Sequence, residues 1–223
     1  MNLNKPKSPA WTAFCASLAS GFITHLFILT NTLHNYDDIA NLPGGYGSGT
    51  NSGRWFLELL GQFFQDLGLN YNLPLLNGLF FLFLVALSAG ILVCTLRITR
   101  RFSAALIGIL FAVFPTASST LFFRFTAIFY GISLFFSVLA PFVMERYRFG
   151  YLGSIILIAL SLGIYQSYVP MTIGIFVLLL IQSAIRGEKP ASAIIGRGLC
   201  YCAVLLAGFL LYYGVTKLST ESG

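Results

Sequence analysis

Long apolar stretches alternate with short polar ones along most of the chain. Seven stretches reach or approach the roughly 20 apolar residues that a helix needs to cross a membrane, and the sixth of them is the shortest. They occupy residues 11–32, 73–96, 103–119, 125–144, 151–168, 171–184 and 194–215. The pattern therefore predicts an all-α fold, a polytopic membrane helix bundle with about seven transmembrane helices.

One polar stretch is much longer than the others. Residues 33–72 form the first loop, and its middle is rich in glycine and therefore flexible. Residues 55–68 of this loop have helical periodicity, with large apolar side chains over most of the surface. A polar or small stripe is formed by Glu58, Gly61, Gln62 and Gln65. We expect an amphipathic helix in the membrane interface, with its aromatic face toward the lipid.

Composition supports membrane insertion and narrows the classes of partner. The chain is 57% hydrophobic and 9% charged, with a mean hydropathy of +0.83, whereas an ordinary soluble domain carries about 25% charged residues. The net charge of +6 comes from short basic clusters between apolar runs and not from a patch or an arm. Membrane lipid is thus an expected partner, and nucleic acid is not.

The basic residues predict the orientation in the membrane. Under alternate crossing most of them fall on one side, which the positive-inside rule makes the cytoplasmic side. These residues are Lys5, Lys7, Arg97, Arg100, Arg101, Arg146, Arg148, Arg186, Lys189 and Arg197. Only Arg54, Arg124 and Lys217 fall on the other side. The N-terminus is therefore predicted to be cytoplasmic, and the loop 33–72 lies outside.

The outer loop carries an acidic pair directly after the first span. Asp37 and Asp38 follow His34 and Tyr36 in the run His-Asn-Tyr-Asp-Asp. Two adjacent carboxylates could act as a general base for a hydroxyl, or they could bind a hard divalent cation. The alternative is an ordinary solvated turn. No other metal site and no other cofactor are predicted.

A single arginine follows the glycine-rich segment of the same loop. Arg54 precedes the predicted loop helix, and Ser52 is the expected N-cap of that helix. A helix N-terminus together with a guanidinium group is suited to bind a phosphate. The alternative is an arginine whose side chain extends to the membrane surface without binding a ligand.

Two further polar clusters lie on the outer side. Residues 115–125 are predicted to form a tight hairpin that includes Arg124. Tyr165, Gln166 and Tyr168 end the fifth span. The tyrosines are either anchors in an aromatic belt or ligands for a substrate, and an amide at this depth needs hydrogen-bond partners.

One histidine lies inside a span. His25 belongs to the first apolar stretch. An intramembrane histidine should face other helices and form hydrogen bonds with them, so we expect a structural role for it.

Four fragments together resemble the GtrII-type bacterial membrane glucosyltransferases, which modify O-antigen or similar surface glycans. The fragments occur in the order of that family and are HNYDDI at 34–39, GRW at 53–55, FPTASSTLFFRFTA at 114–127 and SLGIYQSYV at 161–169. The resemblance implies a GT-C type fold. In such a fold an acidic motif in the first outer loop assists sugar transfer from a polyprenyl-phosphate sugar.

The resemblance also implies roles for individual residues. Asp37 or Asp38 would be the general base, and Arg54 with Arg124 would balance charge on the leaving lipid phosphate. The implied substrate-binding residues are His34, Tyr36, Arg54, Trp55, Arg124, Tyr165, Gln166 and Tyr168.

The sequence departs from the family in two respects. An acidic residue often follows the Phe-Thr-Ala of the third fragment in the family, whereas Ile128 stands here, so a second carboxylate and its metal site lack support. Family members are also usually longer. We therefore interpret residues 1–223 as a single transmembrane domain that is either a short variant or the N-terminal part of a longer GT-C-like protein.

The function implied by the resemblance is hexosyl transfer. A multi-pass protein of the bacterial inner membrane would move glucose or another hexose from a polyprenyl-phosphate donor to a surface glycan such as O-antigen of lipopolysaccharide. The alternative is a non-catalytic transport or accessory protein for lipid-linked sugars. Carriers usually place ionisable residues midway through their spans, whereas the acidic pair here lies at the outer mouth, which favours the enzyme.

Overall fold

The computed structural model describes residues 8–33, 52–69, 73–187 and 190–221. Every regular element in these residues is helical, which confirms the predicted all-α membrane fold. Six stretches of the described chain are long and apolar enough to cross a membrane, close to the seven predicted. They are Pro9–Thr30, Pro74–Thr95, Arg101–Phe122, Arg124–Arg146, Gln166–Arg186 and Ala191–Ser219.

The first two spans begin with a proline. In α1 (Pro9–Thr30) and α4 (Pro74–Thr95) this residue occupies the first turn, where its missing N–H is not needed for a helical hydrogen bond. Ser8 also caps α1, because its hydroxyl accepts a hydrogen bond from the Trp11 N–H at 3.2 Å. Local sequence therefore defines where both helices start.

The third span consists of two helices, α5 (Arg101–Val113) and α6 (Pro115–Phe122). Between them Phe114 is extended, with φ −61° and ψ 139°, because a residue before proline avoids the α region. The proline then starts α6. The prediction of a hairpin at 115–125 is therefore wrong: these residues mostly continue the span, and the turn to the next helix falls at Phe123.

The second half of the chain contains one short helix among long ones. Its elements are α7 (Arg124–Arg146), α8 (Gly150–Ile164), the 3-10 turn η2 (Gln166–Tyr168), α9 (Val169–Arg186) and α10 (Ala191–Glu221). The sequence predicts that the sixth span is the shortest. That prediction is wrong, because α9 has 18 residues whereas α8 has only 15.

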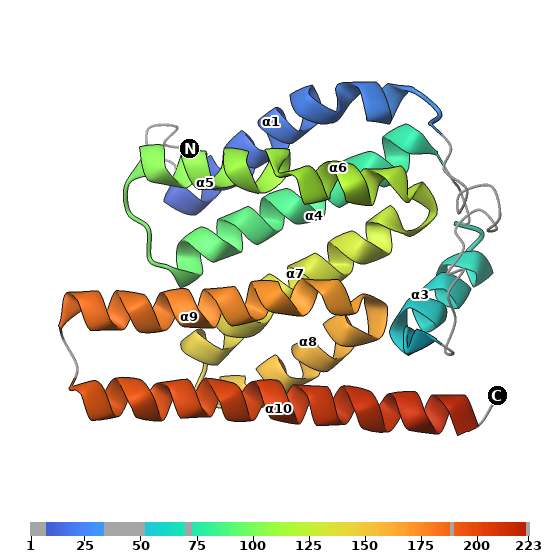
Figure 1. Ribbon diagram of the computed structural model, residues 1–223. Coiled ribbons are helices and arrows are strands. Elements are labelled where there is room, and N and C mark those ends of the chain that lie inside the picture. The colour runs from blue at the N-terminus through green and yellow to red at the C-terminus, as the bar shows by residue number, and fades with distance from the viewer. Residues whose placement is uncertain (1–7, 34–51, 70–72, 188–189, 222–223) are drawn as a thin grey trace, which may run out of the picture.

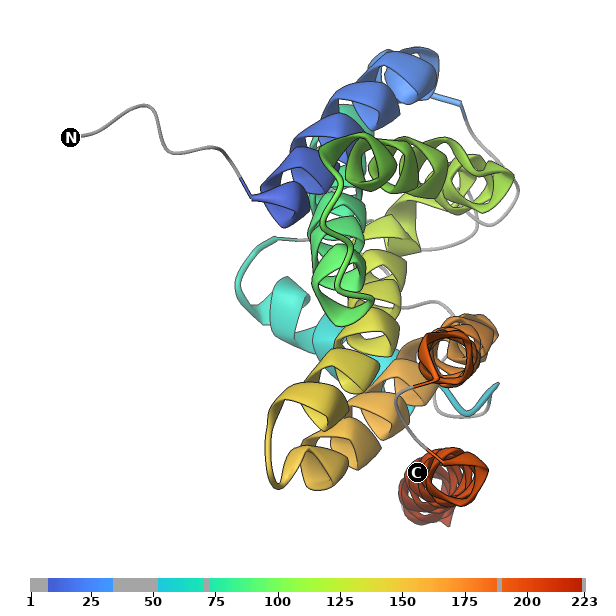
Figure 2. The same ribbon diagram turned by 90° about the vertical axis from the view of Figure 1, so that its left-hand side faces the viewer.

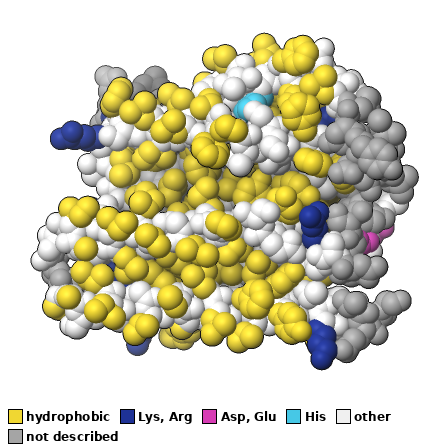
Figure 3. Space-filling view, in the orientation of Figure 1, with side chains coloured by type: hydrophobic (Ala, Val, Ile, Leu, Met, Phe, Trp, Pro, Cys, Tyr) yellow, Lys and Arg dark blue, Asp and Glu magenta, His cyan; other side chains and the backbone are white. Residues whose placement is uncertain are grey.

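Helix α7 joins two groups of helices (Figures 1 and 2). In the first group α4 packs on α7 and on α1, and α1 packs on α5. In the second group α8 packs on α7 and on α10. Helix α9 also contacts α7 and α10. The main core lies between α4 and α7 and includes Phe81, Val85, Leu134 and Val138. Apolar side chains also cover much of the lateral surface of the bundle that Figure 3 shows, as contact with lipid requires.

The order of the helices agrees with alternate crossing. The C-terminal ends of α4, α7 and α9 lie at the same end of the bundle as the N-terminal ends of α5 and α10 (Figure 1). The described arginines that predict the cytoplasmic side therefore gather at one end. Helix α3 (Trp55–Asp66) lies at the other end.

The histidine of the first span has the predicted structural role. His25 is buried, and its Nε2 lies 2.9 Å from the Ala112 carbonyl oxygen. Its Nδ1 lies 3.4 Å from the Ser118 hydroxyl. This side chain ties α1 to both halves of the third span and thereby supports the bent α5–α6 unit.

The predicted loop helix is confirmed, but part of its apolar surface faces protein. Leu57 and Gly61 are buried, and the Phe64 ring meets Phe129 of α7 edge-on with centroids 5.3 Å apart. Gly61 thus belongs to the docked face and not to a polar stripe. Roughly half-exposed apolar side chains on α3 and just after it are Leu59, Phe63 and Leu67. A position of α3 in the membrane interface stays a prediction.

Candidate functional site

Arg54 occupies the N-cap position of α3. Its carbonyl oxygen accepts the Glu58 N–H at 3.1 Å, which closes the first helical turn. The prediction that Ser52 caps this helix is therefore wrong. The correction places Arg54 itself at the helix N-terminus, where unpaired N–H groups and the helix dipole both favour a negative charge.

Aromatic rings fix the position of the Arg54 guanidinium. It donates a hydrogen bond to the Tyr130 hydroxyl at 3.1 Å and lies 4.9 Å from the centroid of the Tyr165 ring. The Tyr130 and Tyr165 rings are themselves stacked, with centroids 4.3 Å apart and 12° between their planes. A planar cation against a rigid aromatic surface keeps its orientation, as a flexible lysine would not.

Tyr168 extends this arrangement toward α6. Its ring meets Tyr165 edge-on at 5.7 Å, and its hydroxyl lies 3.0 Å from the Thr120 hydroxyl oxygen. We call Arg54, Tyr130, Tyr165 and Tyr168 the arginine–tyrosine stack. Tyr165 and Tyr168 thus make protein contacts that an aromatic belt would not require. Tyr130 was not predicted, and its signal in the sequence is the only tyrosine of a mostly apolar span.

Gln166 has the partners that an amide at this depth requires. Its side chain donates to the Tyr212 hydroxyl at 2.9 Å and to the Ser52 carbonyl at 3.4 Å. Gly53 fits beneath the same tyrosine with a φ of +75°, and a Cβ there would lie 2.4 Å from the Tyr212 hydroxyl. Only glycine meets both conditions, so Gly53 sets the path of the chain into Arg54.

Trp55 joins two of the sequence fragments. Its ring lies so close to Gly163 of α8 that a Cβ on the glycine would be 2.8 Å from Cε2. The buried indole N–H has no hydrogen-bond partner among the described residues. The GRW fragment is thereby held against the SLGIYQSYV fragment.

Arg124 is buried at the start of α7, with 4% of its surface exposed. Its carbonyl oxygen accepts a hydrogen bond from the Asn77 side chain of α4 at 3.0 Å. A buried arginine does not extend to the membrane surface. The Arg124 backbone contacts α4, whereas the Arg54 guanidinium lies against α7 and the end of α8.

Four predicted site residues lie outside the described part of the chain. They are His34, Tyr36, Asp37 and Asp38. Their roles as substrate ligands, general base or cation ligands therefore stay predictions. The described residues supply the frame around this loop, because Leu33 precedes it and Ser52 follows it.

An apolar cavity of about 690 Å³ opens beside the stack. Its walls come from α4, α5, α6, α7 and α9, with large apolar side chains such as Phe81, Phe111 and Leu134. Thr116, Ser167 and Tyr168 line it as well. The hollow is visible between α5–α6 and α9 (Figure 3). An apolar hollow whose wall includes a residue of the stack can accept a long hydrocarbon chain that carries a polar head.

Comparison with known proteins gives one family. No curated protein and no solved structure matches the chain. The family described as Glucosyl transferase GtrII matches residues 26–222, which include all four of the fragments quoted above. Membership in this family indicates a membrane glycosyltransferase, which requires a sugar donor and a glycan acceptor. The chain belongs to the Glucosyl transferase GtrII family.

Proposed function

We propose that the protein transfers glucose or another hexose from a polyprenyl-phosphate donor to a glycan acceptor such as O-antigen. The reaction would take place on the outer face of the bacterial inner membrane. The observation that carries this proposal is the fixed guanidinium of Arg54 at the N-terminus of α3. It combines two features that bind phosphate, a planar cation and a helix N-terminus.

The apolar cavity supports a lipid-linked donor over a soluble one. Tyr168 lines this cavity and also touches Tyr165, over which Arg54 lies. A polyprenyl chain in the cavity would therefore bring its phosphate to the arginine–tyrosine stack. A soluble nucleotide sugar would gain nothing from an apolar hollow that opens beside the stack.

The acidic pair would perform the acid–base step. As the acceptor oxygen bonds to the anomeric carbon, its proton passes to the carboxylate of Asp37 or Asp38. The bond between the anomeric carbon and the phosphate oxygen breaks, and its electron pair leaves with the polyprenyl phosphate. Arg54 and the first N–H groups of α3 would stabilise the charge that grows on that phosphate.

Other residues of the outer end would hold the sugars. The indole N–H of Trp55, which has no partner in the described part of the chain, could donate to a hydroxyl of either sugar. His34 and Tyr36 flank the acidic pair in sequence and would supply further hydrogen bonds. Gln166 would act indirectly, because its amide holds the chain at Ser52 next to Arg54.

The acidic pair gives the decisive test. Transfer of radiolabelled glucose from polyprenyl-phosphate glucose to a glycan acceptor should be measured in proteoliposomes that contain the full chain. A positioned general base contributes roughly 10² to 10⁴ in rate, so we expect Asp37→Asn to lose most activity and Asp38→Asn to be impaired. Asp66→Asn is the matched control, because this exposed carboxylate lies at the far end of α3.

Expression and membrane insertion should be nearly unchanged in all three variants, since all three carboxylates belong to the predicted outer loop and surface substitutions usually alter stability by less than about 0.5 kcal/mol. Adjacent residues do not point the same way on an extended chain, so the two asparagine variants should differ. Parental rates in both Asp37→Asn and Asp38→Asn would refute the enzymatic role of this loop and favour a carrier of lipid-linked sugars.

A further inference from the structure

A second polar cavity lies at the end of the bundle opposite to α3. It has a volume of about 580 Å³ and is formed where α4, α7 and α9 end and α10 begins. Its charged lining residues, among those that the structure describes, are Arg97, Arg146, Arg186, Arg197 and Glu145. Four positive charges thus face one negative charge around a single hollow.

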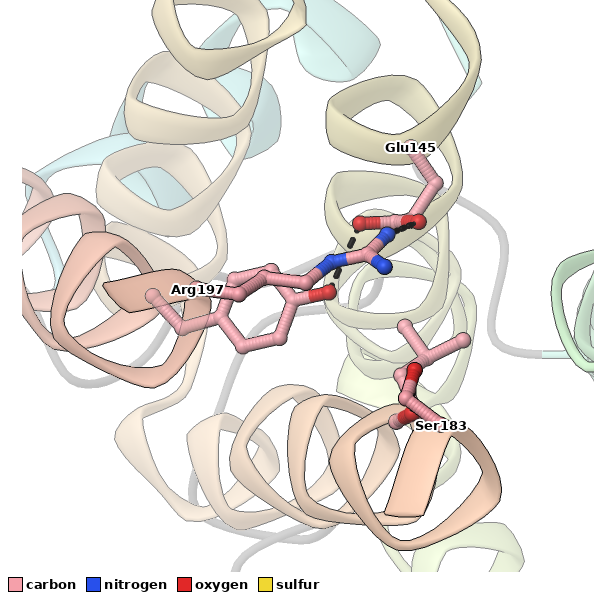
Figure 4. A network of polar contacts seen from close by, with 5 residues as sticks. Glu145, Ser183 and Arg197 are labelled. Atoms are coloured by element: carbon pink, nitrogen blue, oxygen red, sulfur yellow. Dashed lines mark hydrogen bonds and ion pairs between the residues drawn. The ribbon is translucent and has the colours of Figure 1, made fainter. Parts of the chain in front are cut away.

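The one carboxylate is already engaged. Glu145 of α7 forms an ion pair with Arg197 of α10, and it also accepts a hydrogen bond from the Tyr201 hydroxyl at 2.7 Å. Figure 4 shows Glu145 and Arg197 pointing toward each other, with Ser183 of α9 nearby. The pair joins α7 to α10 and leaves the remaining arginines of the cavity without this counter-charge.

The other three arginines converge from three helix ends. Within residues 73–187 and 190–221, no carboxylate forms an ion pair with Arg97, Arg146 or Arg186. Like charges around one hollow repel each other, and a bound anion would remove that repulsion. The Gln182 amide and the Ser183 hydroxyl also line the cavity, so its wall is polar as well as positive.

The backbone of Arg97 gives an independent observation. This residue ends α4 in the left-handed region, with φ 53°, and the Ile98 N–H closes the motif on the Val93 carbonyl at 3.0 Å. Glycine normally holds this position, as Gly68 does after α3 and Gly187 does after α9. A strained arginine where glycine would be relaxed points to a role for its side chain.

An apolar groove adjoins the cavity. It has a volume of about 290 Å³ and shares Gln182 and Arg186 with the cavity. Its other walls include Leu178, Ile181 and Ile185, which are exposed on the surface of α9. A positive hollow that continues into an exposed apolar groove matches a molecule with an anionic head and a hydrocarbon chain.

We propose that this cavity binds the phosphate head group of an anionic phospholipid, with one acyl chain in the adjoining groove. The volume of the cavity is within the range of small-ligand sites. Basic pockets between transmembrane helices are suited to such head groups. The proposal is independent of sugar transfer, because the cavity lies at the end of the bundle away from the arginine–tyrosine stack.

Thermal unfolding of the purified full chain in detergent tests this proposal. Dioleoylphosphatidylglycerol, dioleoylphosphatidylcholine and inorganic phosphate should be titrated separately, and an apparent Kd is obtained from the shift of the unfolding midpoint. We expect phosphatidylglycerol to stabilise the protein and phosphatidylcholine to have little effect. Inorganic phosphate should bind far more weakly than the lipid, because it cannot occupy the groove.

Three variants separate a built site from general attraction. Arg97→Gly removes the side chain where the backbone favours glycine, so backbone strain cannot explain a loss of binding, and thermal unfolding without lipid checks the fold. Arg186→Gln removes the charge shared by cavity and groove. Each should weaken phosphatidylglycerol binding about tenfold or more. Arg148→Gln, an equal charge change at the same end but against Phe149, should change it by less than about twofold.

Three outcomes would overturn the proposal. Equal stabilisation by phosphatidylcholine would show that the head-group charge is irrelevant. An equal loss of phosphatidylglycerol affinity in Arg148→Gln and in the two cavity variants would show that the lipid is attracted by a diffuse positive surface and not by this cavity. Full stabilisation by inorganic phosphate alone, at concentrations comparable to the lipid, would assign the cavity to a soluble phosphate compound and not to a lipid.

Discussion

The two ends of the bundle gather arginines in different ways. At the end of the bundle that carries α3, Arg54 lies over the Tyr165 ring and donates to Tyr130, so its position is fixed by a ring on α7 and a ring that directly follows α8. At the opposite end four arginines from separate helix ends surround an open cavity, and Arg97, Arg146 and Arg186 are exposed.

The difference matches the two uses proposed above for the same side chain. Stabilising a leaving phosphate requires a donor aimed at one oxygen during the reaction. Holding a lipid head group requires positive charge around a hollow and tolerates several geometries. The outer end should therefore depend on the shape of the arginine, and the opposite end on its charge.

Replacing arginine by lysine at both ends gives the sharpest contrast. Arg54→Lys keeps the charge but loses the planar group that lies over Tyr165. Loss of a charge-assisted hydrogen bond to the donor phosphate should lower the transfer rate about 10- to 100-fold at limiting donor. Initial rates at several donor concentrations, with folding checked by thermal unfolding, measure this effect.

Arg197→Lys is the matched change at the other end. Lysine can still pair with Glu145, so we expect the transfer rate to stay within about twofold of the parent. If Arg54→Lys also retains the parental rate, the orientation of Arg54 is irrelevant, and Arg124 becomes the better candidate for the phosphate contact.

The next largest effect concerns the glycine that leads into Arg54. Gly53→Ala introduces a Cβ at a φ of +75° and 2.4 Å from the Tyr212 hydroxyl. We expect a loss of about 2 kcal/mol in the free energy of unfolding, with strain and steric clash both contributing. Thermal unfolding of the purified variant measures it.

Gly68→Ala separates the two contributions. Gly68 has nearly the same conformation, with φ +70°, but nothing lies within 4 Å of the position of a Cβ. Gly68→Ala should therefore lower the free energy of unfolding only by the backbone strain, about 1 kcal/mol. The double variant with Gly53→Ala and Tyr212→Phe should approach this smaller value. Equal costs for Gly53→Ala and Gly68→Ala would show that Tyr212 does not constrain the outer end.

The smallest effect has the opposite sign. Arg97→Gly relieves a left-handed arginine, so in lipid-free detergent we expect the free energy of unfolding to rise by up to about 1 kcal/mol. Anionic lipid should then stabilise the parent more than the variant. A destabilised Arg97→Gly protein without lipid would mean that the arginine side chain supports the fold itself.

Much of the fold follows from the sequence because a bilayer leaves few alternatives. A long apolar stretch in lipid must pair its backbone groups internally, which is why the spans were predictable, and α3 was predictable from its helical periodicity. The bend at Phe114 was not predictable from the sequence. Pro115 suits a turn as well as the first turn of a helix, and only the length of the completed span, Arg101–Phe122, decides between them.

The candidate site was predictable in its components but not in its contacts. Periodicity and motif spacing identified Arg54, Gln166 and the tyrosines near the outer surface. The Arg54 partner Tyr130 lies 76 residues away in sequence, and no local pattern links the two. The basic cavity was missed for the same reason, because charge counting gives the side of the membrane and not the convergence of four helix ends.

The short helix α8 has a consequence for the depth at which the stack would lie in a bilayer. Its 15 residues rise about 22 Å, whereas the hydrocarbon core is roughly 30 Å thick. The neighbouring α10, with 31 residues, is about 46 Å long and exceeds that thickness. This hydrophobic mismatch either thins the outer leaflet beside α8 or leaves Tyr165 several ångströms below the surface. Where the leaflet thins, Arg54 meets lipid phosphates at their own depth, and a donor could reach it by lateral diffusion without leaving the membrane.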